Sequence, residues 1–279
     1  MARPPRRNQI IHGDALQVLR SWPDACVDHC IADPPFNMSK KKGLGWAFSS
    51  HVTMQETWDR FDDDDFFRFN LEWLREVVRV VKPNGNILVF GTYHNIYQLG
   101  FILQNRLNRR LLNSIVWYKP NAQPNITART LTESTEQLVW AVNGPPGGKT
   151  RATGWTFNYW EAKAINGGKQ LRNLWEFPVT PRGERALGKH PSQKPLALVE
   201  RLVQVATAPG DLVLDPFGGA GTLALAAETH GRDWILVESV AAYATLARAR
   251  LKAMRAARRS TQEGTAPHGA IPQDADRQR

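Results

Sequence analysis

The sequence predicts an α/β fold built on a mostly parallel sheet. Short apolar runs alternate with segments of helical periodicity over most of the chain, which is the pattern of strands joined by crossover helices. At 279 residues the chain can bury a full core as one large domain. Its apolar and charged content is that of an ordinary globular protein, and no apolar run approaches the length that spans a membrane.

The charge balance indicates a polyanionic partner. Lysine and arginine total 36 against 26 acidic residues, and the resulting net charge of +10 attracts nucleic acid first of all. Cys26 and Cys30 match no zinc or redox spacing, so we expect core thiols in a reducing compartment. The basic residues 1–7 lead into no signal-peptide core, so we expect a cytoplasmic protein.

The first half of the chain shows regular elements interrupted by one long loop. The predicted elements are a helix that begins at residue 14, a strand over 27–32, a helix over 66–81, a strand over 86–91, a helix over 101–107 and a strand over 112–118. The acidic residues 62–65 favour a helix N-terminus rather than a metal site, because no other ligands of fixed spacing accompany them. Residues 37–57 are predicted to form a loop, whose Lys40, Lys41 and Lys42 are either solvated or contacts to a DNA backbone.

The regular pattern decays between residues 119 and 189. Trp155, Trp160 and Trp175 stand there among basic and amide residues, and they either reach DNA base edges or fill the core of a small lobe. Regular elements then return as a helix over 195–207, a strand over 212–214, a helix over 222–230, a strand over 234–237 and a helix over 241–257. The polar residues 258–279 are predicted to be disordered.

A rigid acidic turn, Asp33-Pro34-Pro35-Phe36, follows the strand predicted over residues 27–32. Proline has a fixed φ and no N–H, and it keeps the residue before it extended. The turn can therefore hold a carboxylate, a free carbonyl and a ring in fixed relation. This combination suits a flat molecule that carries an NH₂ group, although such a turn standing alone is more often an ordinary strand end.

A glycine-rich turn lies in residues 212–222, which read LVLDPFGGAGT. Its glycines let a ligand approach the backbone, beside the free N–H groups of a helix start. Glu238 ends the next predicted strand, where an acid can accept from both ribose hydroxyls of a nucleoside. The GxGxxG pattern is absent and Asp215 disfavours a pyrophosphate. A cationic nucleoside such as S-adenosylmethionine suits this charge better.

With the acidic turn first, an irregular middle and the glycine-rich turn last, the chain resembles the β-class amino-group DNA methyltransferases, which act on N6 of adenine or N4 of cytosine. It is most similar to their cell-cycle-regulated adenine methyltransferase group. The similarity runs from about residue 9 to residue 251. The shared motifs are IIHGD at 10–14, YHNI at 93–96, IVW at 115–117 and HPSQKP at 190–195.

The resemblance implies a doubly wound, mostly parallel seven-stranded sheet, the Rossmann-like methyltransferase fold, with an irregular target-recognition insertion. It divides the chain into a catalytic half at 8–118, a target-recognition region at 119–189, a cofactor-binding half at 190–257 and a disordered tail at 258–279. The implied cofactor is S-adenosylmethionine, and no metal is expected.

The resemblance also assigns the site residues. The catalytic motif is Asp33, Pro34, Pro35 and Phe36. The cofactor-binding residues, which face its adenine, ribose or methionine, are Asp14, His190, Ser192, Lys194, Asp215, Phe217, Gly219, Gly221, Thr222 and Glu238. We expect Asp33 and the Pro34 carbonyl to accept both N–H bonds of the target amine and so free its lone pair for attack on the sulfonium methyl. Phe36 is expected to stack on the flipped base.

Three functions follow in order of preference. Asp33 at the start of the motif favours N6 of adenine, whereas Phe36, where adenine enzymes more often have tyrosine, keeps N4 of cytosine as the alternative. A non-catalytic DNA-binding relative is the outsider. The expected partner is double-stranded DNA and not a membrane. A homodimer, common among relatives, and a cognate restriction enzyme are further candidate partners that the sequence does not specify.

Overall fold

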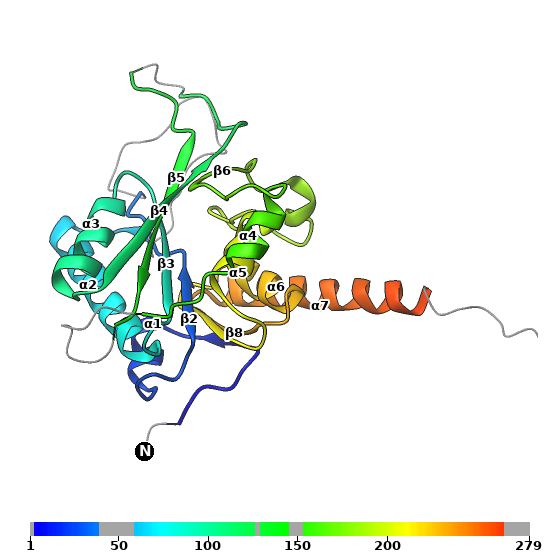
Figure 1. Cartoon of the computed structure of the whole chain (residues 1–279), viewed down its shortest axis with the longest axis horizontal. Coiled ribbons are helices and arrows are strands. Elements are labelled where there is room, and N and C mark those ends of the chain that lie inside the picture. Colours follow the sequence, from blue (N-terminus) through cyan, green and yellow to red (C-terminus); the bar gives the residue numbers. More distant parts are fainter. Residues whose placement is uncertain (1–2, 39–58, 126–128, 145–152, 265–279) are drawn as a thin grey trace, which may run out of the picture.

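The computed structural model describes residues 3–38, 59–125, 129–144 and 153–264, and its centre is one eight-stranded sheet (Figure 1). The strand order is β1-β8-β7-β2-β3-β5-β4-β6, and all neighbours are parallel except the two pairs that involve β5. The strands are β1 (Gln9–His12), β2 (His29–Ala32), β3 (Asn86–Gly91), β4 (Arg110–Tyr118), β5 (Thr135–Val142), β6 (Leu174–Glu176), β7 (Leu212–Asp215) and β8 (Asp233–Glu238). The predicted α/β fold with a mostly parallel sheet is confirmed, with eight strands in place of seven.

Helices cover both faces of the sheet (Figure 1). One face carries α1 (Ala15–Arg20), α2 (Asp63–Val80) and α3 (Ile96–Phe101), and the other carries α4 (Tyr159–Ile165), α5 (Leu196–Ala206), α6 (Thr222–Thr229) and α7 (Ala241–Gly264). Each layer has its own apolar core, because Trp73, Leu74 and Val77 of α2 recur at helical spacing on one side and Leu198 and Leu202 of α5 do so on the other. The sheet is therefore covered on both faces, as parallel sheets require.

Several elements differ from those predicted. β1 was not predicted, and the helix predicted over 101–107 begins earlier, at Ile96, before it continues as a π-helical turn, η2 (Ile102–Arg106). The region 119–189 contains α4, β6 and also β5, which lies inside the sheet between β3 and β4. The strand count exceeds seven because β6, a three-residue strand, pairs with β4 at the edge of the sheet. Trp175, the middle residue of β6, is buried.

The last helix is longer than predicted. It extends to Gly264, so residues 258–264 are helical rather than disordered. Arg255 pairs with the Glu228 carboxylate at 2.7 Å, and Arg258 donates to the Glu228 carbonyl at 3.3 Å. These contacts hold this part of α7 against α6. The remainder of the predicted tail lies outside the described residues, as do Lys40, Lys41 and Lys42.

The sheet places four strand ends at one edge. The strands β1, β8, β7 and β2 are parallel neighbours, so their carboxyl ends meet there. The helices after β1 and β2 lie on one face and those after β7 and β8 lie on the other (Figure 1). The connections therefore change face between β7 and β2, which is where doubly wound sheets open a crevice for a ligand. Over the ranges that the structure describes, no helix is long and apolar enough to cross a membrane.

Candidate active site

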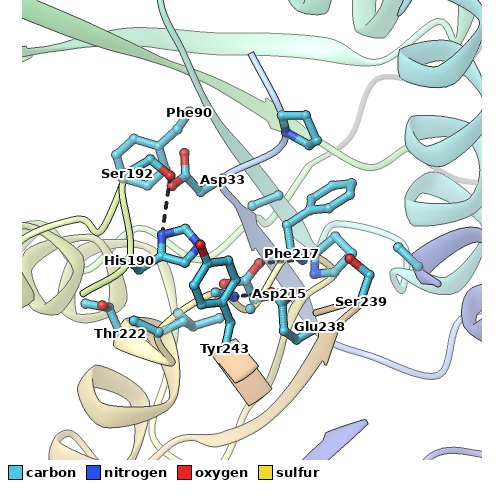
Figure 2. Close-up of a pocket in the computed structure, with 18 of the residues that line it drawn as sticks. Asp33, Phe90, His190, Ser192, Asp215, Phe217, Thr222, Glu238, Ser239 and Tyr243 are labelled. Atoms are coloured by element: carbon cyan, nitrogen blue, oxygen red, sulfur yellow. Dashed lines mark hydrogen bonds between the residues drawn. The ribbon is translucent and has the colours of Figure 1, made fainter. Parts of the chain in front are cut away.

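A cavity of about 410 Å³ lies outside these carboxyl ends and brings the two sequence motifs together (Figure 2). The predicted site residues that line it are Asp14, Asp33, Pro35, His190, Ser192, Lys194, Asp215, Phe217, Gly219, Thr222 and Glu238. The predicted residues Pro34, Phe36 and Gly221 are not among its lining residues. Figure 2 shows Asp33 and Ser192 toward one end of the cavity and Glu238 and Ser239 toward the other, with Asp215 between them.

Glu238, the last residue of β8, is held by the turns on either side of it. Its Oε2 accepts from the Gly219 N–H and its Oε1 from the Val240 N–H, both at 2.7 Å. Gly219 has a φ of +48°, and a Cβ on it would lie 3.2 Å from Nε2 of His190. Glycine therefore keeps the turn close to the carboxylate without filling the cavity. Each Glu238 oxygen keeps a lone pair for a hydroxyl donor.

Asp215 ends β7 in the middle of the cavity wall. Its Oδ1 accepts from the Phe217 N–H at 2.9 Å. Burial raises the pKa of Asp215 to about 8, and the carboxyl groups of Asp33 and Glu238 add to the rise. A cation bound beside this carboxyl favours its ionised form and lowers that pKa again. The position therefore suits an ammonium group.

His190 and Tyr243 form another part of the wall. Their ring centroids are 4.3 Å apart in an edge-to-face arrangement, and Ser192 Oγ lies 3.5 Å from Nδ1 of His190 (Figure 2). Burial lowers the pKa of His190 to about 4, and the positive charges of Lys194 and Arg250 lower it further, so the imidazole is neutral at pH 7.

Ser239 and Tyr243 also line the cavity, and both were missed by sequence reasoning. Their one signal in the sequence is that they follow Glu238 closely, in the turn after β8 and the first turn of α7. Because that turn redirects the chain across the end of the sheet, both side chains reach the cavity from the same side as Glu238 (Figure 2).

Aromatic rings from α2 and from the segments beside it form the apolar side of the cavity. The Phe217 ring lies edge-on to Trp73 with centroids 5.1 Å apart, and its centroid is 6.0 Å from that of Phe69. Phe69 stacks on Phe61 at 4.8 Å, and both of these rings line the cavity. The helical periodicity of α2 indicated which residues face the sheet, but it did not indicate that Phe69 would meet the glycine-rich turn.

Asp33 follows β2 at the other end of the cavity and is paired with Lys194. The Lys194 Nζ donates to Oδ2 of Asp33 at 2.7 Å and lies 2.7 Å from Oδ1. Burial raises the pKa of Asp33 to about 6, and the nearby ammonium of Lys194 limits that rise. The carboxylate is therefore mainly ionised at neutral pH and can accept hydrogen bonds.

Lys194 lines the cavity, and its ammonium is paired with Asp33 of the catalytic motif. Its assignment to the cofactor stays a prediction. The same Nζ is 3.3 Å from Oε2 of Glu136 and 4.9 Å from the ring centroid of Phe36. Phe36 is buried in the core under this ammonium. Sequence reasoning missed Glu136 because it lies on β5, a strand that was not predicted.

Three other predicted residues have structural partners. Asp14 caps α1 by accepting from the Gln17 N–H at 2.9 Å. The Thr222 hydroxyl accepts from Arg250 at 3.1 Å. Gly221 has a φ of +80°, and a Cβ on it would lie 2.8 Å from Cβ of Ala247, so glycine there allows α7 to pack. Among the residues that the structure describes, no group of three His, Cys, Asp or Glu side chains could hold a metal ion.

Asp59 accepts hydrogen bonds from the backbone that follows the catalytic turn. Its Oδ1 accepts from the Asn37 N–H at 2.6 Å and its Oδ2 from the Met38 N–H at 2.8 Å. Asn37 has a φ of +57°, and its Oδ1 accepts from the Phe61 N–H at 2.9 Å. The fully buried carboxylate of Asp59 thus ties the end of the catalytic turn to the segment that leads into α2.

We expect Asp59→Asn to lower the free energy of unfolding by about 1–3 kcal/mol, because the new NH₂ group would face a backbone N–H and leave it without an acceptor. Thermal denaturation followed by circular dichroism measures the loss. The control is Glu176→Gln at the exposed end of β6, where we expect a change within about 0.5 kcal/mol. Equal stability of the two variants would mean that Asp59 does not hold this turn.

Comparison with known proteins shows the family of the chain. The family model N6_N4_Mtase, described as DNA methylase, matches residues 27–249. The type II methyltransferase M2.DpnII of Streptococcus pneumoniae is 35% identical over 246 residues, which cover 88% of this chain and 89% of that protein. The type II methyltransferase M2.MboI of Moraxella bovis is 34% identical over 245 residues, covering 86% of each.

Solved structures share the fold. The crystal structure of the M1.HpyAVI–SAM complex matches with a TM-score of 0.65 and 29% identity, covering 87% of this chain and 98% of that one. The PvuII cytosine-N4-specific DNA methyltransferase matches with a TM-score of 0.69 over 93% of this chain and 94% of that one, but at 19% identity, so this likeness concerns the fold alone.

Proposed function

Because the chain belongs to the DNA methylase family N6_N4_Mtase, we propose that it transfers the methyl group of S-adenosylmethionine to N6 of adenine in double-stranded DNA. The observation that carries this proposal is the single cavity that the acidic turn and the glycine-rich turn both line. Methyl transfer needs an amine and a methyl donor side by side. Asp33 at one end and Glu238 at the other meet that need within one cavity.

The residues present fit S-adenosylmethionine. A cavity of about 410 Å³ is within the usual range for a cofactor of this size. Glu238 offers lone pairs to the ribose hydroxyls, Asp215 offers a buried carboxyl to the ammonium, and the bare Gly219 lets the cofactor approach the backbone. The neutral His190 adds no repulsion toward a cationic ligand. When bound, the cofactor supplies an electrophilic methyl group on a sulfonium.

Asp33 and Pro34 act on the target amine. The Asp33 carboxylate and the Pro34 carbonyl accept its two N–H bonds, so that the nitrogen lone pair is less delocalised into the base. As positive charge develops on the nitrogen, the fixed carboxylate stabilises it. The two prolines and the hydrogen bonds to Asp59 hold this turn in place. Correct orientation of the target amine therefore supplies much of the acceleration. The target base must leave the DNA double helix to reach the cavity.

Adenine is the favoured base, and cytosine is the second candidate. Asp33 as the first residue of the catalytic motif favours N6 of adenine. Phe36, standing where adenine enzymes more often have tyrosine, is the observation that favours N4 of cytosine. Both amines are attached to the same kind of ring carbon, so the same acceptors serve either one.

The proposed setting is the bacterial cytoplasm, beside a cognate restriction enzyme. The two relatives named as type II methyltransferases support the restriction partner, and the net charge of +10 supports DNA as the substrate. We include a homodimer in this proposal, which rests on the family resemblance alone.

Nucleoside analysis tests the proposed function. Bacterial genomic DNA without methylated amines is incubated with the protein and S-adenosylmethionine labelled in its methyl group, then digested to nucleosides and separated by mass. We expect label in N6-methyldeoxyadenosine. Label in N4-methyldeoxycytidine would transfer the proposal to the second candidate, and an absence of label from DNA would contradict methyltransferase activity.

We expect cofactor affinity to rise with pH between about 6 and 8. The pKa of Asp215 is raised to about 8, so its carboxyl is largely neutral at the lower pH, and only the ionised form attracts the ammonium. Above the pKa of Asp215, cofactor affinity gains nothing further from this carboxyl. Calorimetric titration with S-adenosylmethionine across this range measures the trend. Asp215→Asn is the control, because it retains only the titration of the ligand itself. Equal slopes for both proteins would contradict this role of Asp215.

A further inference from the structure

The Lys194 ammonium engages both parts of the motif that the proposed function assigns to the target base. Its Nζ lies 2.7 Å from the Asp33 carboxylate, which is the acceptor proposed for the amine. It also lies 4.9 Å from the ring centroid of Phe36, which is the ring predicted to stack on the base. An ammonium over this ring and against this carboxylate uses the same two groups that an amino-bearing base would use. Lys194 therefore stands where the target amine belongs.

A second acceptor for Lys194 lies beside the first. Oε2 of Glu136 is 3.3 Å from the Lys194 Nζ, longer than the distance to Asp33, and has no hydrogen-bond partner among the described residues. The other Glu136 oxygen, Oε1, is 3.3 Å from the Nζ of Lys119. Glu136 is thus a partly buried carboxylate with one oxygen near Lys119 and the other within reach of Lys194.

Resting on the proposed function, we propose that Lys194 occupies the target-amine position between turnovers and moves onto Glu136 when the flipped base enters. The move releases Asp33 and one face of Phe36 for the base. It needs only a short displacement of a flexible side chain, since the ammonium already lies between the two carboxylates. In the second state the Lys194 ammonium stays paired with Glu136, and Asp33 accepts hydrogen bonds from the target amine in place of the ammonium. Lys194 and Glu136 are positioning residues in this account.

The proposal has a signature in the pH dependence of methyl transfer. The charged groups that face Asp33 are Lys194, Glu136, Asp59 and, across the cavity, Asp215. Among them, Lys194 lowers the pKa of Asp33 and Glu136 raises it. Transfer needs ionised Asp33, so the rate falls as pH drops through that pKa. Lys194→Met should move this acidic limb to higher pH, and Glu136→Gln should move it to lower pH.

The two variants should also differ in how readily the base enters. The probe is a synthetic duplex shown to accept labelled methyl from the protein, with 2-aminopurine at the target position, whose fluorescence rises when the base leaves the stack. Lys194→Met removes the competing ammonium, so we expect the flipped state to form at least as readily as in the wild type. Glu136→Gln leaves Lys194 on Asp33, and we expect about 10-fold weaker flipping.

Single-turnover rates from pH 5 to pH 9, with cofactor and DNA saturating, test the proposal. Opposite displacements of the acidic limb by Lys194→Met and Glu136→Gln, together with weaker flipping in Glu136→Gln alone, support it. Lys252→Met, at an exposed site on α7, is the control and should leave the profile as in the wild type. A uniform fall in rate at every pH, with the limb in place for both variants, overturns it. If Lys194→Met does not fold, the test uses Lys194→Arg and Glu136→Gln instead. The arginine keeps the positive charge, so the acidic limb of its pH–rate profile should stay at the wild-type pH.

The two proposals fail in distinguishable ways. A wild-type protein that places no methyl group on DNA contradicts the proposed function itself. A wild-type protein that methylates DNA, with neither limb displaced in the variants, contradicts only the movement of Lys194.

Discussion

Asp33→Asn will lower the single-turnover rate of methyl transfer by about 10²- to 10⁴-fold, the usual range for the loss of one group that acts directly in the transition state. The amide has the same shape as the carboxylate, but it carries no charge and presents an NH₂ group toward the incoming amine. The substitution therefore replaces one of the two carboxylate oxygens by a donor. It also removes the negative charge that stabilises the positive charge developing on the amine nitrogen. Cofactor affinity should be nearly unchanged, because the cofactor-binding carboxylates lie elsewhere in the cavity (Figure 2).

The measurement is transfer of labelled methyl to DNA with enzyme in excess over substrate. Asp24→Asn is the matched control, since the Asp24 side chain is 78% exposed and pairs only at the surface with Arg79. We expect its rate to match that of the wild type to within about twofold. A wild-type rate in Asp33→Asn would remove Asp33 from the reaction, whatever the fate of the cofactor site.

Glu238→Gln should act in the opposite way, weakening cofactor binding by about 10- to 100-fold with little change in the rate at saturating cofactor. The Glu238 carboxylate accepts from the Gly219 and Val240 N–H groups at 2.7 Å and has lone pairs left for the ribose. A glutamine offers one acceptor oxygen in place of two, so either a backbone N–H or the ribose loses its partner.

Calorimetric titration with S-adenosylmethionine measures this loss. Glu176→Gln, an exposed residue at the end of β6, is the control and should bind the cofactor as the wild type does. Together with Asp33→Asn the result separates binding from chemistry. A Glu238→Gln protein with wild-type affinity, or one whose rate falls while its affinity holds, would place the cofactor elsewhere.

The sequence predicted the two halves of the site because each is a local pattern at a strand end. Asp33 follows β2 and Asp215 ends β7, and parallel neighbouring strands bring such ends together without any further information. Glu238 is predictable for the same reason, since β8 pairs with β7. The family resemblance added His190 and Ser192, which come from a loop that no periodicity could place.

The residues that the sequence did not reveal depend on long-range packing. β5 is antiparallel within a parallel sheet and lies in a stretch of irregular composition, so Glu136 could not be placed beside Asp33. Lys194 was assigned to this cavity, but its pairing with Asp33 could not be foreseen, because a motif fixes the backbone and not the direction of a long side chain. Phe69 of α2 contacts Phe217, which follows β7, although the two residues are far apart in the sequence. The similarity to cell-cycle-regulated enzymes stays a prediction.

The most direct test of the central claim is a structure of the protein with a cofactor analogue and a duplex that contains the methylated site. The account predicts a flipped base whose amine lies about 2.7–3.2 Å from the Asp33 carboxylate and from the Pro34 carbonyl. It also predicts the cofactor ribose at Glu238 and the Lys194 ammonium on Glu136. A base bound away from Asp33, or a cofactor that does not touch Glu238, would contradict the account.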